Sequence, residues 1–344
     1  MSVRIIDIAE KANVSPASVS LVLNNKKGVG QKTREKILEI SKNMDYQGPV
    51  TKQFRDTNAD SICFLHIARH GHIVNRDHDV FIADFIEGMS KELKKRNFSL
   101  KIDTFKDVSI EEIIKHSKNI NSAGIIVLGT ELSYKEARAF LNIKKPIVFI
   151  DNYYKYLNFD FVDMNNEDSV EKIIKNFIYN GHTKIGMITG SISTPNFKLR
   201  EEAYQSSLKH HGLKFNKKFV YTVDSTFLGA YHDIKEILKM ETDIPTAFFC
   251  TNDIIACGCL KGFSELGISI PEDVSVIGFD NLPISAITTP ELTTIDVSKV
   301  RMGRMAVQLL YDRVTKATTG PPVKVLIGGK LIERNSVKHF SNIC

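Results

Sequence analysis

Long apolar runs and cysteines are scarce in this sequence of 344 residues. No segment approaches the roughly 20 apolar residues that a membrane span requires, so we expect no membrane contact. The N-terminus has no signal-peptide pattern, because Arg4, Asp7 and Glu10 interrupt its apolar positions. The five cysteines, among them Cys257 and Cys259, lack a second pair or a nearby histidine. We therefore predict no metal site, and small buried thiols in a reducing cytoplasm.

The sequence signatures of enzymes are also missing. No Gly-x-Ser-x-Gly elbow occurs, and no glycine-rich dinucleotide fingerprint follows the first predicted strand. Residues 28–33 match only part of a phosphate-binding loop, and nothing pairs His182 with a nucleophile. We predict that the protein is not an enzyme and uses no cofactor.

The composition is typical of a globular chain, with 42% hydrophobic and 25% charged residues. A chain of this length is expected to form two or three compact units. Its net charge of +6 is concentrated in residues 1–55, where ten Lys or Arg residues accompany five acids. A positive excess confined to one short segment favours attraction to a phosphate backbone. An ordinary solvated helical surface is the alternative.

The N-terminal segment has the pattern of three short helices. Asn13 tolerates a left-handed backbone and so predicts a tight turn after the first helix. Ser15 then offers a side-chain cap, and Pro16 is suited to the first position of a second helix. Two helices around a tight turn form a helix-turn-helix, whose second helix can enter a DNA major groove. The expected helices span residues 5–12, 16–24 and 31–44.

After a Gly48-Pro49 break, short apolar runs alternate with amphipathic segments. This pattern indicates βα units and parallel sheets buried on both faces. The predicted strands fall into two groups of roughly five or six: 62–68, 100–104, 124–128, 146–151, 161–164, 184–189, 219–223, 247–250 and 274–279, with late strands at 293–296, 323–326 and 330–333. The predicted domains are a headpiece (1–48), a hinge (49–60) and a two-lobed α/β core (61–340), with lobe 1 at about 61–160 and 291–320 and lobe 2 at about 161–290 and 321–340.

Polar residues follow several of these predicted strands. Asp280 follows strand 274–279, Asp151 ends the strand that starts at residue 146, and Asn252 and Asp253 follow strand 247–250. Ligands of parallel sheets bind at the carboxyl ends of the strands. Acids and amides there accept paired hydroxyl hydrogen bonds, as a polyhydroxylated ligand requires. Asp253 has a second interpretation, as the cap of the helix after it.

Motifs spread along the chain carry a family resemblance. They include Asp7-Ile8-Ala9, Val14-Ser15, Val22-Leu23-Asn24, Thr33-Arg34-Glu35-Lys36, Asn180-Gly181-His182, Asn252-Asp253, Val276-Ile277-Gly278-Phe279-Asp280 and Ile332-Glu333-Arg334. With these motifs the chain resembles the lactose/galactose-repressor family of bacterial transcription regulators over practically its whole length. The resemblance implies a DNA-binding headpiece, a hinge and a periplasmic-binding-protein-like core of two Rossmann-like lobes. It further implies a homodimer that binds double-stranded operator DNA and senses a small molecule. We expect no tetramer, because no leucine heptad follows Glu333.

In the second helix the chain departs from this family. Leu21 replaces the usual arginine, which removes the side chain best suited to guanine O6 and N7. Pro16 and Ala17 offer only apolar contact, so we expect readout to rely on the serines, Asn24 and thymine methyl groups. The positions that the resemblance assigns to DNA contact are Ser15, Pro16, Ala17, Ser18, Ser20, Leu21, Asn24, Thr33, Arg34 and Tyr46.

The predicted hinge departs further. Family members usually have Tyr-x-Pro-Asn, then a short helix whose leucine wedges into the minor groove. This chain has Tyr46-Gln47-Gly48-Pro49, and Arg55 falls at the leucine position. Two interpretations stay open: the adjacent Phe54 inserts between bases instead, or residues 49–58 form a flexible linker.

For the effector, Arg200 matches the family's ligand-binding arginine, whose guanidinium can bridge two ligand oxygens. Phe81 and Phe227 are expected to stack on an apolar sugar face. His70-Gly71-His72 either reaches the cleft or lies at the surface. We predict a repressor of a carbohydrate-use operon, controlled by a sugar or glycoside. The alternatives are control by a purine or a protein corepressor, or a pure sugar-binding protein, which the headpiece argues against.

Overall fold

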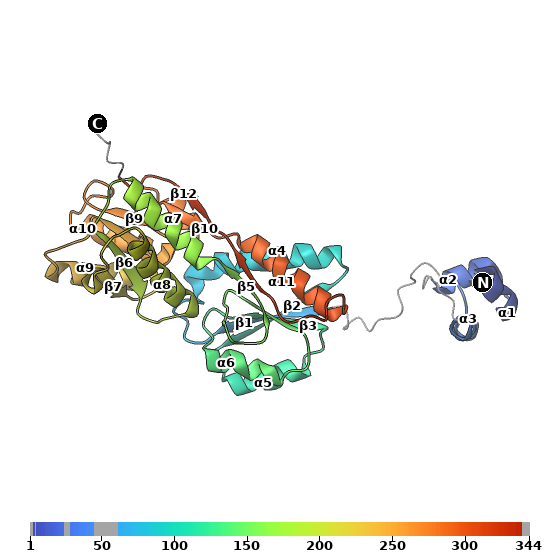
Figure 1. Ribbon diagram of the computed structural model, residues 1–344. Helices are drawn as coiled ribbons and strands as arrows, with labels where there is room; N and C mark the ends of the chain where they lie inside the picture. Colours follow the sequence, from blue (N-terminus) through green and yellow to red (C-terminus); the bar gives the residue numbers. More distant parts are fainter. Residues whose placement is uncertain (1–2, 4, 24–27, 45–60, 339–344) are drawn as a thin grey trace. The chain divides into compact units, whose positions relative to one another are not determined.

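The computed structural model describes residues 3, 5–23, 28–44 and 61–338. The chain divides into two compact units, residues 1–59 and 60–344, which are described separately (Figure 1). Within the described residues, no helix is long and apolar enough to cross a membrane.

The first unit consists of three short helices, as the sequence predicts. They are α1 (Ile5–Ala12), α2 (Pro16–Leu23) and α3 (Gln31–Asn43). All three contribute to one small core, whose buried members are Ile8, Ala9, Ala12, Val19, Val22 and Ile37. Helices α1 and α2 each bury an apolar face in this core. The shared core therefore holds the two helices together on either side of the tight turn.

The second unit contains two parallel sheets and a two-stranded antiparallel ribbon. The larger sheet has the order β11 (Lys324–Ile327), β5 (Asp160–Met164), β4 (Ile147–Ile150), β3 (Gly124–Leu128), β1 (Ser61–Ala68) and β2 (Ser99–Lys106). The smaller sheet has the order β7 (Val220–Val223), β6 (Ile185–Gly190), β8 (Ala247–Cys250) and β9 (Ser275–Ile277). The ribbon pairs β10 (Thr294–Asp296) with β12 (Lys330–Ile332). Strands β3 and β8 are buried along their whole length, which explains their continuously apolar sequences.

Helices cover both faces of each sheet (Figure 1). The larger sheet lies between α4 (Asp79–Lys95) with α11 (Lys299–Val314) and α5 (Ile110–Asn119) with α6 (Tyr134–Ala139). The smaller sheet lies between α7 (Asn166–Tyr179) with α8 (Pro195–His210) and α9 (Phe227–Met240) with α10 (Asp253–Glu265). We call the larger sheet with its helices lobe 1 and the smaller sheet with its helices lobe 2. Short 3-10 turns complete the unit: η1 (Arg76–His78), η2 (Phe140–Asn142), η3 (Lys217–Phe219) and η4 (Pro283–Ala286).

Helices α4 and α11 pack against each other through glycines. A Cβ at Gly88 would lie 2.1 Å from the carbonyl oxygen of Val300, and one at Gly303 would lie 2.3 Å from that of Phe85. Only glycine permits this backbone approach. The close packing fixes the start of α11, and with it Lys299, beside the carboxyl ends of the strands.

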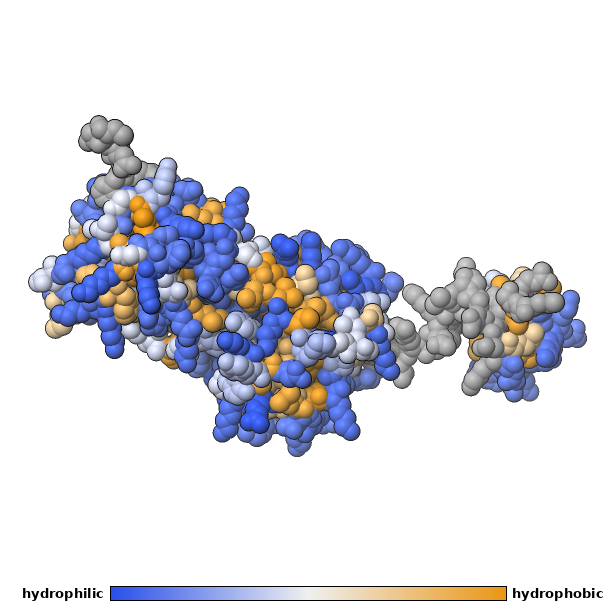
Figure 2. Space-filling view, in the orientation of Figure 1, coloured by the Kyte–Doolittle hydropathy of each residue, from blue (hydrophilic) through white to orange (hydrophobic). Residues whose placement is uncertain are grey.

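The chain crosses between the lobes at three short segments, from β5 to α7, from β10 to α11 and from β11 to β12. Three parallel crossings of a few residues each form a hinge about which two lobes can close. Hydrophilic residues cover most of the face of this unit seen in Figure 2, and the apolar ones gather near its middle.

The sheets differ from the predicted division of the core. Residues 161–164 and 324–326 were expected in lobe 2, but β5 and β11 pair within the sheet of lobe 1, with Phe161 opposite Lys324. Strands β5 and β11 each lead directly into a segment that crosses to lobe 2. The chain therefore enters lobe 2 after these strands and not before them. The smaller sheet has four strands instead of the predicted five or six.

Candidate functional site

The turn between α1 and α2 has the geometry that its residues predict. Asn13 adopts φ 56°, in the left-handed region, which asparagine tolerates better than most residues. The backbone amide of Ser18 donates to Ser15 Oγ over 3.1 Å, so Ser15 caps the start of α2. The turn therefore combines a left-handed backbone at Asn13 with a side-chain cap from Ser15.

The start of α2 is its accessible end. Ser15, Pro16 and Ala17 are exposed, whereas Val19 and Val22 are buried against the rest of the headpiece. Half-buried positions among the predicted DNA contacts are Ser18, Ser20, Leu21, Thr33 and Arg34. Asn24, Tyr46, Phe54 and Arg55, also predicted to contact DNA, lie outside the described residues. The described part thus exposes the N-terminal end of α2, which is the end of a recognition helix that contacts base edges in a major groove.

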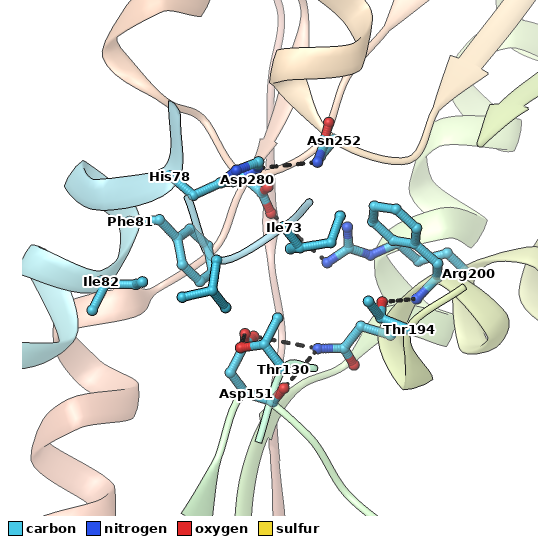
Figure 3. A pocket seen from close by; sticks show the side chains of 13 residues that line it. Ile73, His78, Phe81, Ile82, Thr130, Asp151, Thr194, Arg200, Asn252 and Asp280 are labelled. Carbon is cyan, nitrogen blue, oxygen red and sulfur yellow. Dashed lines mark hydrogen bonds and ion pairs between the residues drawn. The ribbon is translucent and has the colours of Figure 1, made fainter. Parts of the chain in front are cut away.

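A cavity lies between lobe 1 and lobe 2, at the carboxyl ends of the strands (Figure 3). Its volume in this structure is about 40 Å³. We call it the interlobe cavity. Its lining residues from lobe 1 are Ile73, Val74, His78, Phe81, Ile82, Thr130 and Asp151; those from lobe 2 are Thr194, Asn196, Phe197, Arg200, Asn252 and Asp280. Five of the seven predicted effector residues, Phe81, Asp151, Arg200, Asn252 and Asp280, are therefore brought together.

Arg200 is held rigidly in this cavity by its surroundings. Its Nε donates to Asn166 Oδ1 over 2.9 Å, and its Nη1 donates to the carbonyl oxygen of Thr251. The guanidinium carbon lies 3.7 Å from the centroid of the Phe279 ring. Burial lowers the pKa of Arg200, although the neighbouring Asp280 opposes that shift. Arg200 is thus a preorganised positive charge with a structural role as well.

Asp280 presents a buried carboxylate without a hydrogen-bond donor among the described residues. Its side-chain Oδ1 is buried and unpartnered, and its nearest cationic atom is Arg200 Nη2 at 3.7 Å. Its backbone φ of 109° is strained for a residue with a side chain. The backbone carbonyl accepts a 2.6 Å hydrogen bond from Lys299 Nζ, which helps to fix that conformation. Burial raises the pKa of Asp280 to about 6, and Arg200 and Lys299 partly oppose the shift.

Asp151 connects the two lobes from the opposite wall. It also has a positive φ, 64°, and Thr130 donates a hydrogen bond to its Oδ2. Asn196 of lobe 2 donates to its Oδ1 over 3.3 Å and to its backbone oxygen over 3.2 Å. Burial raises the pKa of Asp151 to about 7; the hydrogen bond from Thr130 and the charge of Arg200 oppose this, and Asp280 adds to it. Asp163, fully buried behind it and within 3.3 Å of Asn196 Nδ2, also has a raised pKa through burial and the nearby Asp151.

Two predicted effector residues do not line the cavity. Asp253 is fully buried as the first residue of α10, where it accepts hydrogen bonds from Thr294 Oγ1 over 2.6 Å and from the Leu282 amide over 2.8 Å. Its carboxylate lies under the backbone of Gly278, where a Cβ would meet Asp253 Oδ1 at 2.2 Å. Phe227 is the first residue of α9, and its amide donates to Asp77 Oδ2 over 3.3 Å. Asp253 was predicted from its place after a strand and Phe227 as an aromatic that stacks on a sugar, and neither argument established the direction of the side chain.

Other cavity residues were missed by the sequence analysis. Thr130 lies two residues after β3, and the rule that selected Asp151 would also have found it. Asn196 sits in the first turn of α8, which Thr194 caps. His78 Nε2 lies 3.1 Å from Asn252 Nδ2 of lobe 2. Because burial lowers the pKa of His78 to about 4, its imidazole is neutral and accepts a hydrogen bond from Asn252. No signal in the sequence distinguishes this histidine from others.

The remaining histidine and cysteine patterns lie outside the cavity. His72 Nδ1 lies 3.3 Å from Asp224 Oδ2, and neither His70 nor His72 lines the cavity. The four cysteines within the described residues are buried and unpaired, as expected for small core side chains. At the lobe 2 surface, Glu171, His210 and His211 place one ligand atom each within 4.8 Å of one another; Glu171 is already bonded there to Ser207.

Comparison with known proteins agrees with this arrangement of parts. Residues 4–48 match the family model described as bacterial regulatory proteins, lacI family, and residues 174–337 match that of the periplasmic binding protein-like domain. The HTH-type transcriptional repressor PurR of Aliivibrio salmonicida (strain LFI1238) is 29% identical over 312 residues, which are 90% of this chain and 91% of that protein.

Solved structures share the fold over nearly the whole chain. A lac repressor dimer bound to operator and the anti-inducer ONPF has a TM-score of 0.73 at 21% identity, covering 98% of this chain and 100% of that chain. A complex of the transcriptional regulator CelR with cellobiose has a TM-score of 0.71 at 22% identity, covering 97% and 99%.

Proposed function

Because this chain belongs to the lacI family of bacterial regulatory proteins, and is therefore a DNA-binding transcriptional regulator, we propose that it represses a carbohydrate-use operon and responds to a sugar or glycoside. The effector occupies the interlobe cavity. The headpiece binds operator DNA through the exposed start of α2, and the core forms a homodimer. Such a dimer matches a roughly two-fold symmetric operator.

One observation carries the sugar proposal, namely the polar constellation of Asp280, Asp151 and Arg200 beside aromatic faces. The two carboxylates accept hydrogen bonds from hydroxyl groups, and the guanidinium donates to ring or hydroxyl oxygens. Phe81 and Phe197 line the same cavity and offer faces for the apolar side of a sugar ring. Polar groups that fix orientation, set among apolar walls, are the usual composition of a small-molecule site.

The proposed ligand control of DNA binding follows from the fact that both lobes contribute residues to the cavity lining. Asp151 and Phe81 belong to lobe 1, whereas Arg200 and Asp280 belong to lobe 2. A ligand that contacts both lobes prefers one closure state of the core. The ligand shifts the equilibrium between closure states only as far as its affinities for those states differ. The shift acts on the DNA-binding dimer through the hinge crossings.

A thermal-shift screen combined with DNA binding tests this proposal. The full chain is screened with sugars, glycosides and nucleobases, because only a ligand preferring the folded core raises its Tm. Each compound that raises Tm is then added to a complex of the chain with duplex DNA selected from a randomised pool. We expect a sugar or glycoside to raise Tm and to change the Kd for the duplex. Stabilisation by nucleobases alone would contradict the sugar proposal.

A purine effector is the second candidate, and one finding favours it. The similar curated proteins carry the name PurR at 27–29% identity. The rings of Phe81 and Phe197 could enclose a planar base instead of a sugar. Hypoxanthine and guanine in the screen separate the two candidates directly.

A further inference from the structure

One segment in the wall of the interlobe cavity contacts both lobes. Residues 69–78 lie between β1 and α4 in the chain and therefore belong to lobe 1. They contribute Ile73, Val74 and His78 to the cavity lining, and Figure 3 shows the contact of His78 with Asn252 of lobe 2. We call residues 69–78 the strap. Its contacts with each lobe determine where the cavity can open.

A single buried carboxylate, that of Glu131, holds the strap on lobe 1. Its Oε2 accepts hydrogen bonds from the backbone amides of Arg69 over 2.6 Å and His70 over 3.1 Å. Its Oε1 accepts from the amides of Ile73 over 3.0 Å and Val74 over 2.8 Å. Burial alone would raise the pKa of Glu131, but these four amide hydrogen bonds lower it below its ordinary value. Hydrogen bonds to a buried, ionised carboxylate are strong, so the strap is firmly attached to lobe 1.

The polar contacts of the strap with lobe 2 are neutral, long or partly exposed. Asp77 Oδ2 accepts from the Phe227 amide at the start of α9 over 3.3 Å. His72 Nδ1 lies 3.3 Å from Asp224 Oδ2, and these side chains are 37% and 30% exposed. Water screens such pairs, so they contribute less than the buried bonds to Glu131. The side chain of Ile73 completes these contacts by packing into the apolar core of lobe 2.

The size of the cavity shows that its walls must move. Its volume of about 40 Å³ is far below the roughly 300 Å³ or more of typical small-molecule sites. A sugar ring or a planar base therefore enters only after the walls have separated. Separation is easiest where the contacts are weakest, which is between the strap and lobe 2.

We propose that the strap is the gate of the interlobe cavity: it stays bonded to Glu131 and parts from lobe 2 to admit the effector. Glu131 is thus a positioning residue, because it acts on the cavity through the strap. Closure over a ligand restores the contacts of Ile73 and Asp77 with lobe 2, which favours the closed state of the core. The inference rests on the proposed binding of the effector in this cavity, but not on the effector being a sugar.

Cysteine labelling of the full chain tests this movement without a ligand. The probe is Ile73→Cys in a Cys344→Ser background, because the four other cysteines are buried. The rate of alkylation by N-ethylmaleimide reports how often residue 73 leaves the core of lobe 2. Hydrogen exchange measured by mass spectrometry reports whether the amides of residues 69–74 stay bonded to Glu131.

The variants are made in this labelled chain. Asp77→Asn should raise the alkylation rate at least about threefold, because a neutral side chain is held less well at the start of a helix. Asp224→Asn should act in the same direction, and neither variant should change the exchange of the strap amides. Glu131→Gln should instead accelerate that exchange. The control Glu111→Gln, at an exposed acid in the first turn of α5, should change neither rate.

Unchanged alkylation in both Asp77→Asn and Asp224→Asn would overturn the gate. A parallel rise of alkylation and amide exchange in Asp77→Asn would also overturn it, because the strap would then unfold locally instead of moving as a unit.

Ligand entry is tested with glucose, galactose, ribose, hypoxanthine and guanine. For each of these compounds that raises Tm, Asp77→Asn should increase the association rate by about the same factor as the alkylation rate. An unchanged association rate would show that the ligand enters elsewhere and would overturn the gate. A failure of every compound to raise Tm would count against the proposed function, while the alkylation rates would still decide whether the strap parts from lobe 2.

Discussion

Arg200 Nη2 and Asp280 Oδ1 lie 3.7 Å apart, too far for a direct hydrogen bond. Both side chains are buried, and both belong to lobe 2. A buried ion pair that leaves a carboxylate oxygen unpartnered is costly unless another group completes it. A ligand hydroxyl next to both groups can donate to Asp280 and accept from Arg200, and this arrangement underlies the predicted effect of replacing either residue.

Asp280→Asn should remove the ligand response and leave operator affinity without ligand near that of wild type. Loss of a charge-assisted hydrogen bond removes about 1.5–3 kcal/mol of binding, which corresponds to roughly tenfold or more in ligand Kd. Arg200→Ala should also remove the response but lower Tm as well, because Arg200 bonds to Asn166 and Thr251. Calorimetry, melting curves and duplex titrations of both variants measure these effects. A normal response in both would remove the two residues from the site.

The position of the interlobe cavity was largely predictable from the sequence. Asp151 and Asp280 follow continuously apolar strands, and carboxyl ends of parallel strands gather at one edge. Asp253 also comes shortly after an apolar strand, but it is the first residue of a helix and does not line the cavity, which strand order does not reveal. His78 enters the site from the 3-10 turn η1, and no pattern in the sequence distinguishes it from the other histidines.

Deleting residues 1–58 should abolish duplex binding and leave ligand binding by the core unchanged. The predicted DNA contacts lie in this segment, whereas the interlobe cavity is lined by residues 73–280. For the full chain, duplex affinity should fall steeply with salt, since residues 1–55 carry most of the net positive charge. Anisotropy titrations at several salt concentrations give both results. Specific duplex binding by the truncated chain would contradict the assignment of the headpiece.

The turn at Asn13 allows a test confined to the headpiece. At φ 56°, a β-branched residue is strained, so Asn13→Val should destabilise the headpiece by about 1–2 kcal/mol. Asn13→Gly should be neutral or slightly stabilising, because glycine adopts this conformation freely. Circular dichroism melts of the two variants in the full chain, with duplex affinity measured in parallel, provide the comparison. Equal stability of the Val and Gly variants would argue against a left-handed residue at this turn.

The buried Asp253 predicts that core stability falls as the pH rises from 7 to 9. Burial raises its folded-state pKa from 3.8 to about 8, so the folded state retains a proton that the unfolded state has lost. The contribution of this proton to the free energy of unfolding is lost as the pH rises through the folded-state pKa. The loss between pH 7 and pH 9 is about 1 kcal/mol. Asp253→Asn resembles the protonated form and should flatten the dependence of stability on pH. The control Glu111→Gln, at an exposed acid in the first turn of α5, should leave this dependence unchanged. Denaturant titrations at each pH measure the slope; identical slopes in both variants would exclude Asp253 as its source.

The effect of ligand on duplex affinity tests the account most directly. Duplexes are selected from a randomised pool with the full chain, and the Kd for the selected duplex is measured with and without each sugar that raises Tm. We predict that one such sugar changes the Kd about tenfold or more for wild type and less than about twofold for Asp280→Asn. An unchanged Kd for wild type at saturating concentrations of every stabilising sugar would contradict ligand-controlled repression by this protein.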